Sequence, residues 1–164
     1  MAALRNINFC SFCGSRLDEK FLYGKLRPWC PTCRKPIFLD PKVAAGVVIQ
    51  KEGSLLLVQR KNPPFQGCWT LPAGFVDACE DPRKAAEREC FEETGLVVEV
   101  THLIDSYFGR DHSNGADFVL FFAAKILSGD LLAGDDASNV AWFQPEDYPE
   151  LAFPSTHALI ASLR

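Results

Sequence analysis

The chain has 164 residues and a formal net charge of −4, with 48% hydrophobic and 23% charged residues. This composition is typical of a soluble globular protein and excludes an intrinsically disordered one, and the longest apolar runs (43–49 and 118–124) are too short to span a bilayer. An acidic chain without the apolar core of a signal peptide predicts a cytoplasmic protein with neither a membrane nor a nucleic-acid partner.

The first 40 residues contain two Cys-x-x-Cys pairs, Cys10 with Cys13 and Cys30 with Cys33. Sixteen residues separate the pairs, which is the spacing of a structural zinc ribbon in which four thiolates close a tetrahedral site. Four unligated cysteines, or two redox pairs, are the alternatives. The segment has few large apolar residues, so we expect bound Zn²⁺ to supply its folding energy.

The rest of the chain alternates between strand and helix patterns. Val43 to Gln50 is β-branched and apolar and predicts a buried strand, and 55–60 its hairpin partner after the turn Glu52-Gly53. Further strands are expected within 96–108, at 118–126 and at 140–143. Residues 128–139 are expected to form a loop, Pro145 to begin a helical turn, and 155–163 to form a closing amphipathic helix.

Between these strands, residues 82–94 predict a helix. Asp81 is a suitable N-cap, Pro82 suits the first helical position, and Gly95 suits the left-handed position after the last turn. Phe91 is expected to anchor the helix on the core from the side opposite to its acidic residues.

Three carboxylates, Glu89, Glu92 and Glu93, fall on one patch of this helix, centred near Ala85. Like charges three and four residues apart destabilise a helix, so the patch needs a compensating partner. Hard divalent cations fit, since they bind carboxylate oxygens and take phosphate oxygens as further ligands, and the small Ala85 would let a bulky ligand approach. A solvated charged helix face is the plainer alternative.

The spacing around this patch resembles the signature of the Nudix hydrolases: G, five residues, E, seven residues, R-E, an aliphatic residue, any residue, E-E, any residue, G and an aliphatic residue. Cys90 replaces the usual bulky aliphatic residue, and a buried free cysteine behaves as a small hydrophobe. The preceding segment, 67–74, resembles the G-x-W-x-L-P-x-G approach of the same family. The matching positions are Gly74, Glu80, Arg88, Glu89, Glu92, Glu93, Gly95 and Leu96.

The resemblance implies an α/β fold, a Nudix α/β/α sandwich with a mixed sheet over residues 41–164, preceded by a small four-cysteine zinc ribbon over residues 1–40. It implies a pyrophosphohydrolase that cleaves the diphosphate of a nucleoside diphosphate linked to X. The family uses Mg²⁺ or Mn²⁺. By resemblance the ions are held by Glu89, Glu92, Glu93 and the carbonyl of Ala73, with Glu92 as either ligand or general base.

Three further residues have roles by resemblance alone. Glu80 and Arg88 brace the loop against the helix, with Arg88 orienting the carboxylates. Asp136 is the candidate for an additional acidic residue contributed by a loop, as metal ligand or base.

A zinc ribbon ahead of a Nudix domain resembles the NADH pyrophosphatase branch and its relatives that act on FAD or ADP-ribose. The chain departs from that branch just after the signature, where it has Ile104-Asp-Ser-Tyr-Phe-Gly-Arg-Asp. Tyr107 and Phe108 are expected to stack on a base and Arg110 to contact phosphate. Many Nudix enzymes dimerise, so a homodimer is compatible with the resemblance. The alternative function is a non-catalytic nucleotide sensor with the ribbon as a partner-binding module.

Overall fold

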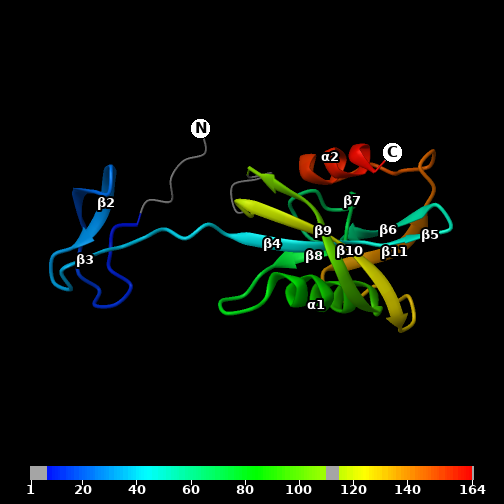
Figure 1. Cartoon of the computed structure of the whole chain (residues 1–164), viewed down its shortest axis with the longest axis horizontal. Helices are drawn as coiled ribbons and strands as arrows, with labels where there is room; N and C mark the ends of the chain where they lie inside the picture. Colours follow the sequence, from blue (N-terminus) through cyan, green and yellow to red (C-terminus); the bar gives the residue numbers. More distant parts are fainter. Residues whose placement is uncertain (1–6, 110–114, 164) are drawn as a thin grey trace. The chain divides into compact units, whose positions relative to one another are not determined.

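The structure, a computed structural model, describes residues 7–109 and 115–163. The chain divides into two compact units, Met1–Pro41 and Lys42–Arg164. Figure 1 shows the course of the chain through each unit. Neither helix of the described residues has the length and apolar character that a membrane span requires.

The first unit is an antiparallel sheet of β1 (Asp18–Leu22), β2 (Lys25–Cys30) and β3 (Lys35–Pro36). Tyr23 and Gly24 link β1 to β2, and both have positive φ, 51° and 81°, as a two-residue type I′ hairpin turn requires. Among its described residues, the buried hydrophobic side chains are Cys10 and Cys30. From residue 7 to Pro41, the unit therefore has no apolar core apart from its cysteines.

The second unit contains two sheets. One has the order β8-β4-β10-β9, with β4 and β10 parallel and the other pairs antiparallel, and the other has the order β11-β6-β5, with the short β7 paired to β6. The predicted mixed sheet is thus confirmed. The strands are β4 (Val43–Val48), β5 (Gln50–Lys51), β6 (Ser54–Arg60), β7 (Trp69–Thr70), β8 (Ala73–Phe75), β9 (Val97–Phe108), β10 (Phe118–Ser128) and β11 (Ala137–Phe143).

Helices α1 (Pro82–Thr94) and α2 (Pro154–Ser162) lie on opposite sides of the strands (Figure 1). Successive side chains of a strand point to opposite faces of the sheet, so a buried strand packs against both the α1 side and the α2 side. On β4, Val47 belongs to the core cluster under α1, while Val48 belongs to the cluster with Leu159 and Ile160 of α2. This arrangement confirms the expected α/β/α sandwich.

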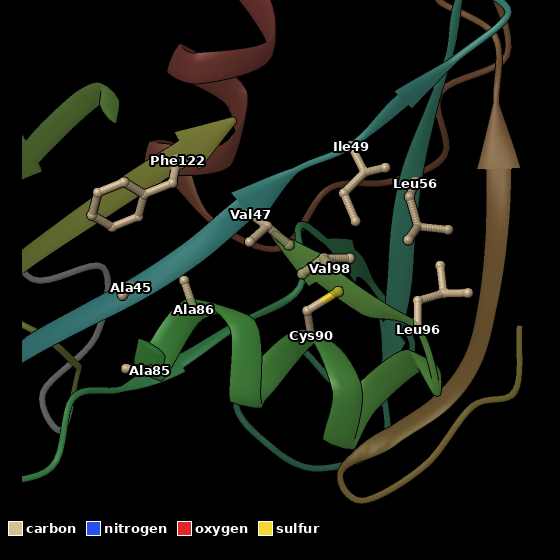
Figure 2. Packing of buried hydrophobic residues seen from close by; sticks show 10 residues of the cluster. All are labelled: Ala45, Val47, Ile49, Leu56, Ala85, Ala86, Cys90, Leu96, Val98 and Phe122. Carbon is tan, nitrogen blue, oxygen red and sulfur yellow. The ribbon is translucent and has the colours of Figure 1, made fainter. Parts of the chain in front are cut away.

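The predicted capping residues lie at the two ends of α1. The Asp81 side chain accepts a hydrogen bond from the backbone N–H of Arg83 at 2.8 Å, and Gly95 ends the helix with φ 72°. A small-residue face, Ala85, Ala86 and Cys90, is fully buried against the strands. Figure 2 shows this face of α1 turned toward Val47 and the other core side chains.

Two expectations for this helix are wrong. Phe91 is 54% exposed and does not anchor α1, and Ala85 is fully buried, so no ligand approaches through it. Small side chains allow the helix backbone to pack closely on the sheet, which makes Ala85, Ala86 and Cys90 the contact face. Burial raises the pKa of the Cys90 thiol to about 11, in keeping with its role as a small hydrophobe.

The C-terminal third also differs from expectation. The strand expected at 140–143 begins at Ala137, because β11 pairs with β6 along nearly its whole length. Pairing with a neighbouring strand overrides the weak strand propensity of Ser138 and Asn139. Pro145 begins a turn closed by the Asp147 N–H and the Gln144 carbonyl at 3.0 Å, and no helix follows it there.

Candidate active site

A cavity of about 510 Å³ lies in the second unit, beside β8 and α1. Its wall draws on β4, β6, β7, β8, α1, β10, the segment before β11 and the start of α2. Acidic residues gather in it: Asp77, Glu89, Asp135 and Asp136 line the cavity together with the cations Arg60 and Arg88. The remaining lining residues are Ala44, Pro63, Pro64, Thr70, Ala73, Gly74, Phe75, Gly115, Ala116, Val119, Phe121, Phe153, Ser155 and Thr156.

Glu89 reaches the cavity across Gly74. A Cβ at position 74 would overlap the Glu89 carboxylate, so only glycine leaves room for it. The Glu89 side chain is 15% exposed. Burial raises its pKa, and this effect outweighs the opposite influence of Arg88, while Glu92 and Asp136 add to it.

Glu93 lies deeper than Glu89 and is 5% exposed. Its carboxylate accepts a hydrogen bond from the backbone N–H of Ala73 at 3.0 Å. Burial, and next the charge and hydrogen bonding of Asp136, raise the pKa of Glu93 well above its usual range. The site therefore disfavours ionisation of Glu93.

Asp136 lies near Glu93 because backbone hydrogen bonds attach the loop before β11 to the end of α1. The backbone N–H of Leu132 donates to the Thr94 carbonyl at 2.9 Å, and that of Gly134 to the Glu93 carbonyl at 3.1 Å. These bonds satisfy carbonyls that a helix end leaves without intrahelical partners. The loop thus brings Asp136 over the last turn of α1.

Arg88 holds the acidic residues in place. Its Nε and Nη2 donate to the two oxygens of Glu80 at 2.9 and 3.0 Å, and its Nη1 donates to Glu89 at 2.8 Å and Glu92 at 3.0 Å. Nη2 also donates to the carbonyl of Phe75 at 3.1 Å. The guanidinium thus joins the loop before α1 to the helix through planar, charge-assisted bonds that few other side chains can reproduce.

Glu92 differs from its two neighbours. Its side chain is 40% exposed and bonded to Arg88, whereas Glu89 lines the cavity and Glu93 is buried against the Ala73 N–H. The three carboxylates expected to form one patch are therefore split. Glu89 and Glu93 point inward with Asp136, and Glu92 lies at the edge.

The inward carboxylates suit a divalent cation. They are oxygen donors that lie close together, and burial, followed by repulsion between the carboxylates, raises the pKa values of Glu89 and Glu93. The carbonyl of Ala73 belongs to the residue whose N–H already meets Glu93. Glu89, Glu93, Asp136 and Ala73 are accordingly the residues that fit Mg²⁺ or Mn²⁺.

The expected base-stacking residues lie elsewhere. The Tyr107 ring packs edge-on against Phe121, with centroids 5.9 Å apart, and Phe108 is 81% exposed beside Phe118. Neither lines the cavity. Arg110, the expected phosphate contact, lies outside the described residues.

The cavity instead has a cation and a ring that the sequence pattern does not identify. Arg60, at the end of β6, lies over the ring of Phe153 at 4.9 Å and donates from Nε to the Pro64 carbonyl at 2.9 Å. Arg60 ends a strand, and Phe153 precedes a helix much later in the chain. Only the folded sheet brings them together, so no local motif marks them.

The four cysteines of the first unit form a separate cluster. All four Sγ atoms lie within 4.8 Å of one another, with Cys10 and Cys33 at 4.0 Å and Cys13 and Cys30 at 3.5 Å. A tetrahedral zinc site with Zn–S bonds of roughly 2.3 Å places its sulfurs about 3.8 Å apart. In the part of the chain that the structure describes, no other group of His, Cys, Asp and Glu side chains is gathered as tightly around a point.

Sequence and structure comparisons agree with this geometry. The NUDIX domain family matches residues 40–162. The chain is 40% identical over 118 residues to an ADP-ribose pyrophosphatase from Methanocaldococcus jannaschii, covering 71% of this chain and 70% of the relative. It is 28% identical over 160 residues to the NAD-capped RNA hydrolase NudC of Shigella flexneri, covering 94% of this chain and only 58% of that relative.

Among solved structures, a NUDIX hydrolase from Nitrosomonas europaea superimposes with a TM-score of 0.82 at 31% sequence identity, covering 93% of this chain and 87% of the other. The match extends over both the cysteine-rich segment and the segment with the cavity. The family match over most of the chain and the 40% identity to the archaeal relative lead to one conclusion: the chain belongs to the Nudix hydrolase family.

Proposed function

We propose that the protein is a divalent-metal-dependent pyrophosphohydrolase that cleaves the diphosphate of a nucleoside diphosphate linked to X, with ADP-ribose as the leading substrate. The observation that carries the proposal is the acidic group of Glu89, Asp136 and the buried Glu93. Glu89 and Asp136 line the cavity together with Arg60, and Glu93 adjoins it through its hydrogen bond from Ala73, a lining residue. The archaeal relative at 40% identity, an ADP-ribose pyrophosphatase, supports the choice of substrate.

Glu89, Glu93 and Asp136 would hold Mg²⁺ or Mn²⁺ together with the carbonyl of Ala73. The bound metal neutralises charge on the phosphate oxygens and makes a coordinated water more acidic. The chain contributes a prearranged set of oxygens. Glu93 is fixed by the Ala73 N–H and Glu89 by Arg88, so neither has to be ordered when substrate arrives.

Arg60 is the residue we assign to the phosphate contact in place of Arg110. Among the described lining residues, the cations are Arg60 and Arg88, and Arg88 is already bonded to three carboxylates. The Phe153 ring under Arg60 and the Pro64 carbonyl orient its guanidinium within the wall. A cation held in this way stabilises the negative charge that develops on the diphosphate.

Hydrolysis also requires that the attacking water lose a proton. Glu89 and Asp136 are the candidates to accept it, because both carboxylates line the cavity. Glu92, held by Arg88 at the edge, takes the role of positioning Arg88 rather than touching substrate.

A substrate panel tests the proposal. Purified full-length protein is incubated with ADP-ribose, NADH or FAD, with and without Mg²⁺ or Mn²⁺, and products are separated by ion-exchange chromatography. We expect AMP and ribose 5-phosphate from ADP-ribose, only when metal is added, and slower AMP release from the larger dinucleotides. Nucleotide binding without product from any compound would favour the sensor function instead.

A further inference from the structure

The first unit presents cations interleaved with aromatic rings, of which Tyr23 and Phe38 are exposed and Trp29 is partly exposed. The Lys20 Nζ atom lies 4.3 Å from the centre of the Trp29 ring. Arg27 lies 5.9 Å from the ring of Tyr23 and 5.1 Å from that of Phe38, and these two rings are stacked with centroids 6.3 Å apart. We call these five residues, Lys20, Tyr23, Arg27, Trp29 and Phe38, the ribbon platform.

Strand register places the centre of the platform on one face of the hairpin. Lys20 pairs directly with Arg27, and Trp29 is two residues beyond Arg27 on β2. Directly paired residues, and residues two apart, share a face of a sheet, so these three side chains are neighbours. Phe21 pairs with Leu26 on the opposite face and is also exposed, at 68%.

Folding of the unit does not account for the platform. Tyr23 is 75% exposed and Phe38 53% exposed, so their rings contribute little to any core. Tyr23 also has φ 51°, a left-handed conformation that a bulky residue adopts only at a cost and that asparagine or glycine adopts readily. An exposed aromatic ring kept at a strained turn position points to a role in binding.

The charge of the unit indicates the kind of partner. Up to Pro41 the sequence has seven Lys and Arg residues and three Asp and Glu residues, a formal charge of +4, although the whole chain carries −4. Zn²⁺ bound by four thiolates lowers the charge of the unit by two, so the unit stays basic. The overall charge that predicted no nucleic-acid partner therefore conceals a basic unit joined to a strongly acidic one. A polyanion complements the basic unit.

We propose that the ribbon platform binds single-stranded nucleic acid, with bases stacked on Tyr23, Phe38 and Trp29 and phosphates met by Lys20 and Arg27. Exposed rings interleaved with cations are what sequence-tolerant single-strand binding requires, since every base offers a face to stack and every linkage a charge. An acidic protein surface would satisfy the cations but would leave the exposed rings without matching partners. This binding is independent of the proposed hydrolysis.

The primary test is fluorescence anisotropy with the full-length, zinc-loaded chain and a fluorescein-labelled oligouridylate of about ten nucleotides. The buffer contains no magnesium, so that no hydrolysis occurs. We expect saturable binding that weakens as salt rises, and weaker binding of a duplex of the same length, because paired bases cannot stack on the platform. Absence of binding at low salt, or equal binding of the duplex and of heparin, overturns the proposal.

Tyr23→Asn is the decisive variant, because asparagine suits the left-handed turn position. The variant should have an unchanged or higher Tm and bind the oligonucleotide about tenfold more weakly, as expected for the loss of one stacking ring. Phe21→Ala removes an equally exposed ring from the opposite face and should leave binding unchanged. Equal losses in both variants, or no loss in Tyr23→Asn, would contradict the assignment.

Charge variants and size measurements complete the test. Lys20→Gln with Arg27→Gln should lower the slope of log affinity against log salt concentration, because fewer counterions are released. ADP-ribose hydrolysis should be unchanged in all these variants. If size-exclusion chromatography shows a dimer that Tyr23→Asn converts to a monomer, the platform is a subunit contact and the nucleic-acid proposal is wrong.

Discussion

The carboxylate of Glu89 lies over the Cα of Gly74, in the space that any other side chain at position 74 would fill. This contact gives a physical reason for the first glycine of the Nudix signature. A substitution at Gly74 should therefore displace the Glu89 carboxylate while Glu89 itself stays in the chain.

Gly74→Ala should lower the turnover rate for ADP-ribose on the order of a hundredfold, because the added methyl group displaces a carboxylate that must be placed within about an ångström. The backbone of Gly74 is not in the left-handed region and the displaced atoms end a flexible side chain, so the Tm should fall only slightly. Steady-state kinetics and a thermal melt check both parts. An unchanged turnover rate would show that Glu89 does not act from its place over Gly74.

Glu93→Gln should reduce turnover on the order of a hundred- to a thousandfold while leaving the fold intact. The amide oxygen still accepts the Ala73 N–H, and the buried charge beside Asp136 is gone. Because the pKa of Glu93 is raised in the folded state, its ionised form destabilises the native protein at neutral pH. The Tm of the metal-free variant should therefore equal or exceed that of the wild type.

Glu87→Gln is the matched control for this variant. Glu87 also lies on α1, but it bonds to Lys84 and to the Val100 N–H, away from the cavity. Its turnover should match that of the wild type. If Glu87→Gln and Glu93→Gln lose the same activity, the effect comes from the helix as a whole and not from the acidic cluster.

The pairing of Arg88 with Glu80 predicts a specific acid sensitivity. The two bonds from Arg88, together with the Asp77 N–H, lower the pKa of Glu80 from its ordinary value of 4.5 to about 2. Since the folded-state pKa is the lower one, the stabilisation is complete above pH 4.5 and is lost as the pH falls from there toward 2. The difference in Tm between the wild type and Glu80→Gln should therefore shrink as the pH falls over that interval. A difference in Tm that does not change with pH would refute the pairing.

Zinc is expected to maintain the first unit. Since its buried hydrophobic residues, among those described, are the cysteines Cys10 and Cys30, removal of the metal takes away most of its folding free energy. Mass spectrometry should find zinc in the purified chain. Removal of zinc by a chelator should speed amide hydrogen exchange in the first unit and leave the amides of α1 protected from exchange. Protection of the first unit that persists after the metal is gone would disprove this dependence.

Local sequence signals determine much of the Nudix-like unit. The cap at Asp81, the left-handed Gly95 and the continuous apolar run of β4 each depend on neighbours in sequence, and each is found as predicted. The buried face of α1 is the exception. Hydrophobicity favours Phe91 as the anchor, whereas close packing on the sheet selects the small Ala85, Ala86 and Cys90.

The candidate site required tertiary structure. The family signature identified Glu89, Glu93 and Arg88, and resemblance alone suggested Asp136, but the split between inward Glu93 and outward Glu92 depends on how α1 meets the strands. Arg60 approaches Phe153 only through the folded sheet. The residue type of Tyr107 suggested stacking on a base, but its contact with Phe121, which depends on how β9 packs, could not be read from the sequence.

The most direct test of the account is to locate the metal. Crystals of the protein grown with Mn²⁺ and α,β-methylene ADP-ribose, which cannot be hydrolysed at the diphosphate, would reveal manganese by anomalous diffraction. We predict manganese between the diphosphate and the oxygens of Glu89, Glu93 and Asp136. Manganese bound elsewhere, with these carboxylates contacting neither metal nor ligand, would contradict the claim that the acidic cluster exists to bind a metal–pyrophosphate complex.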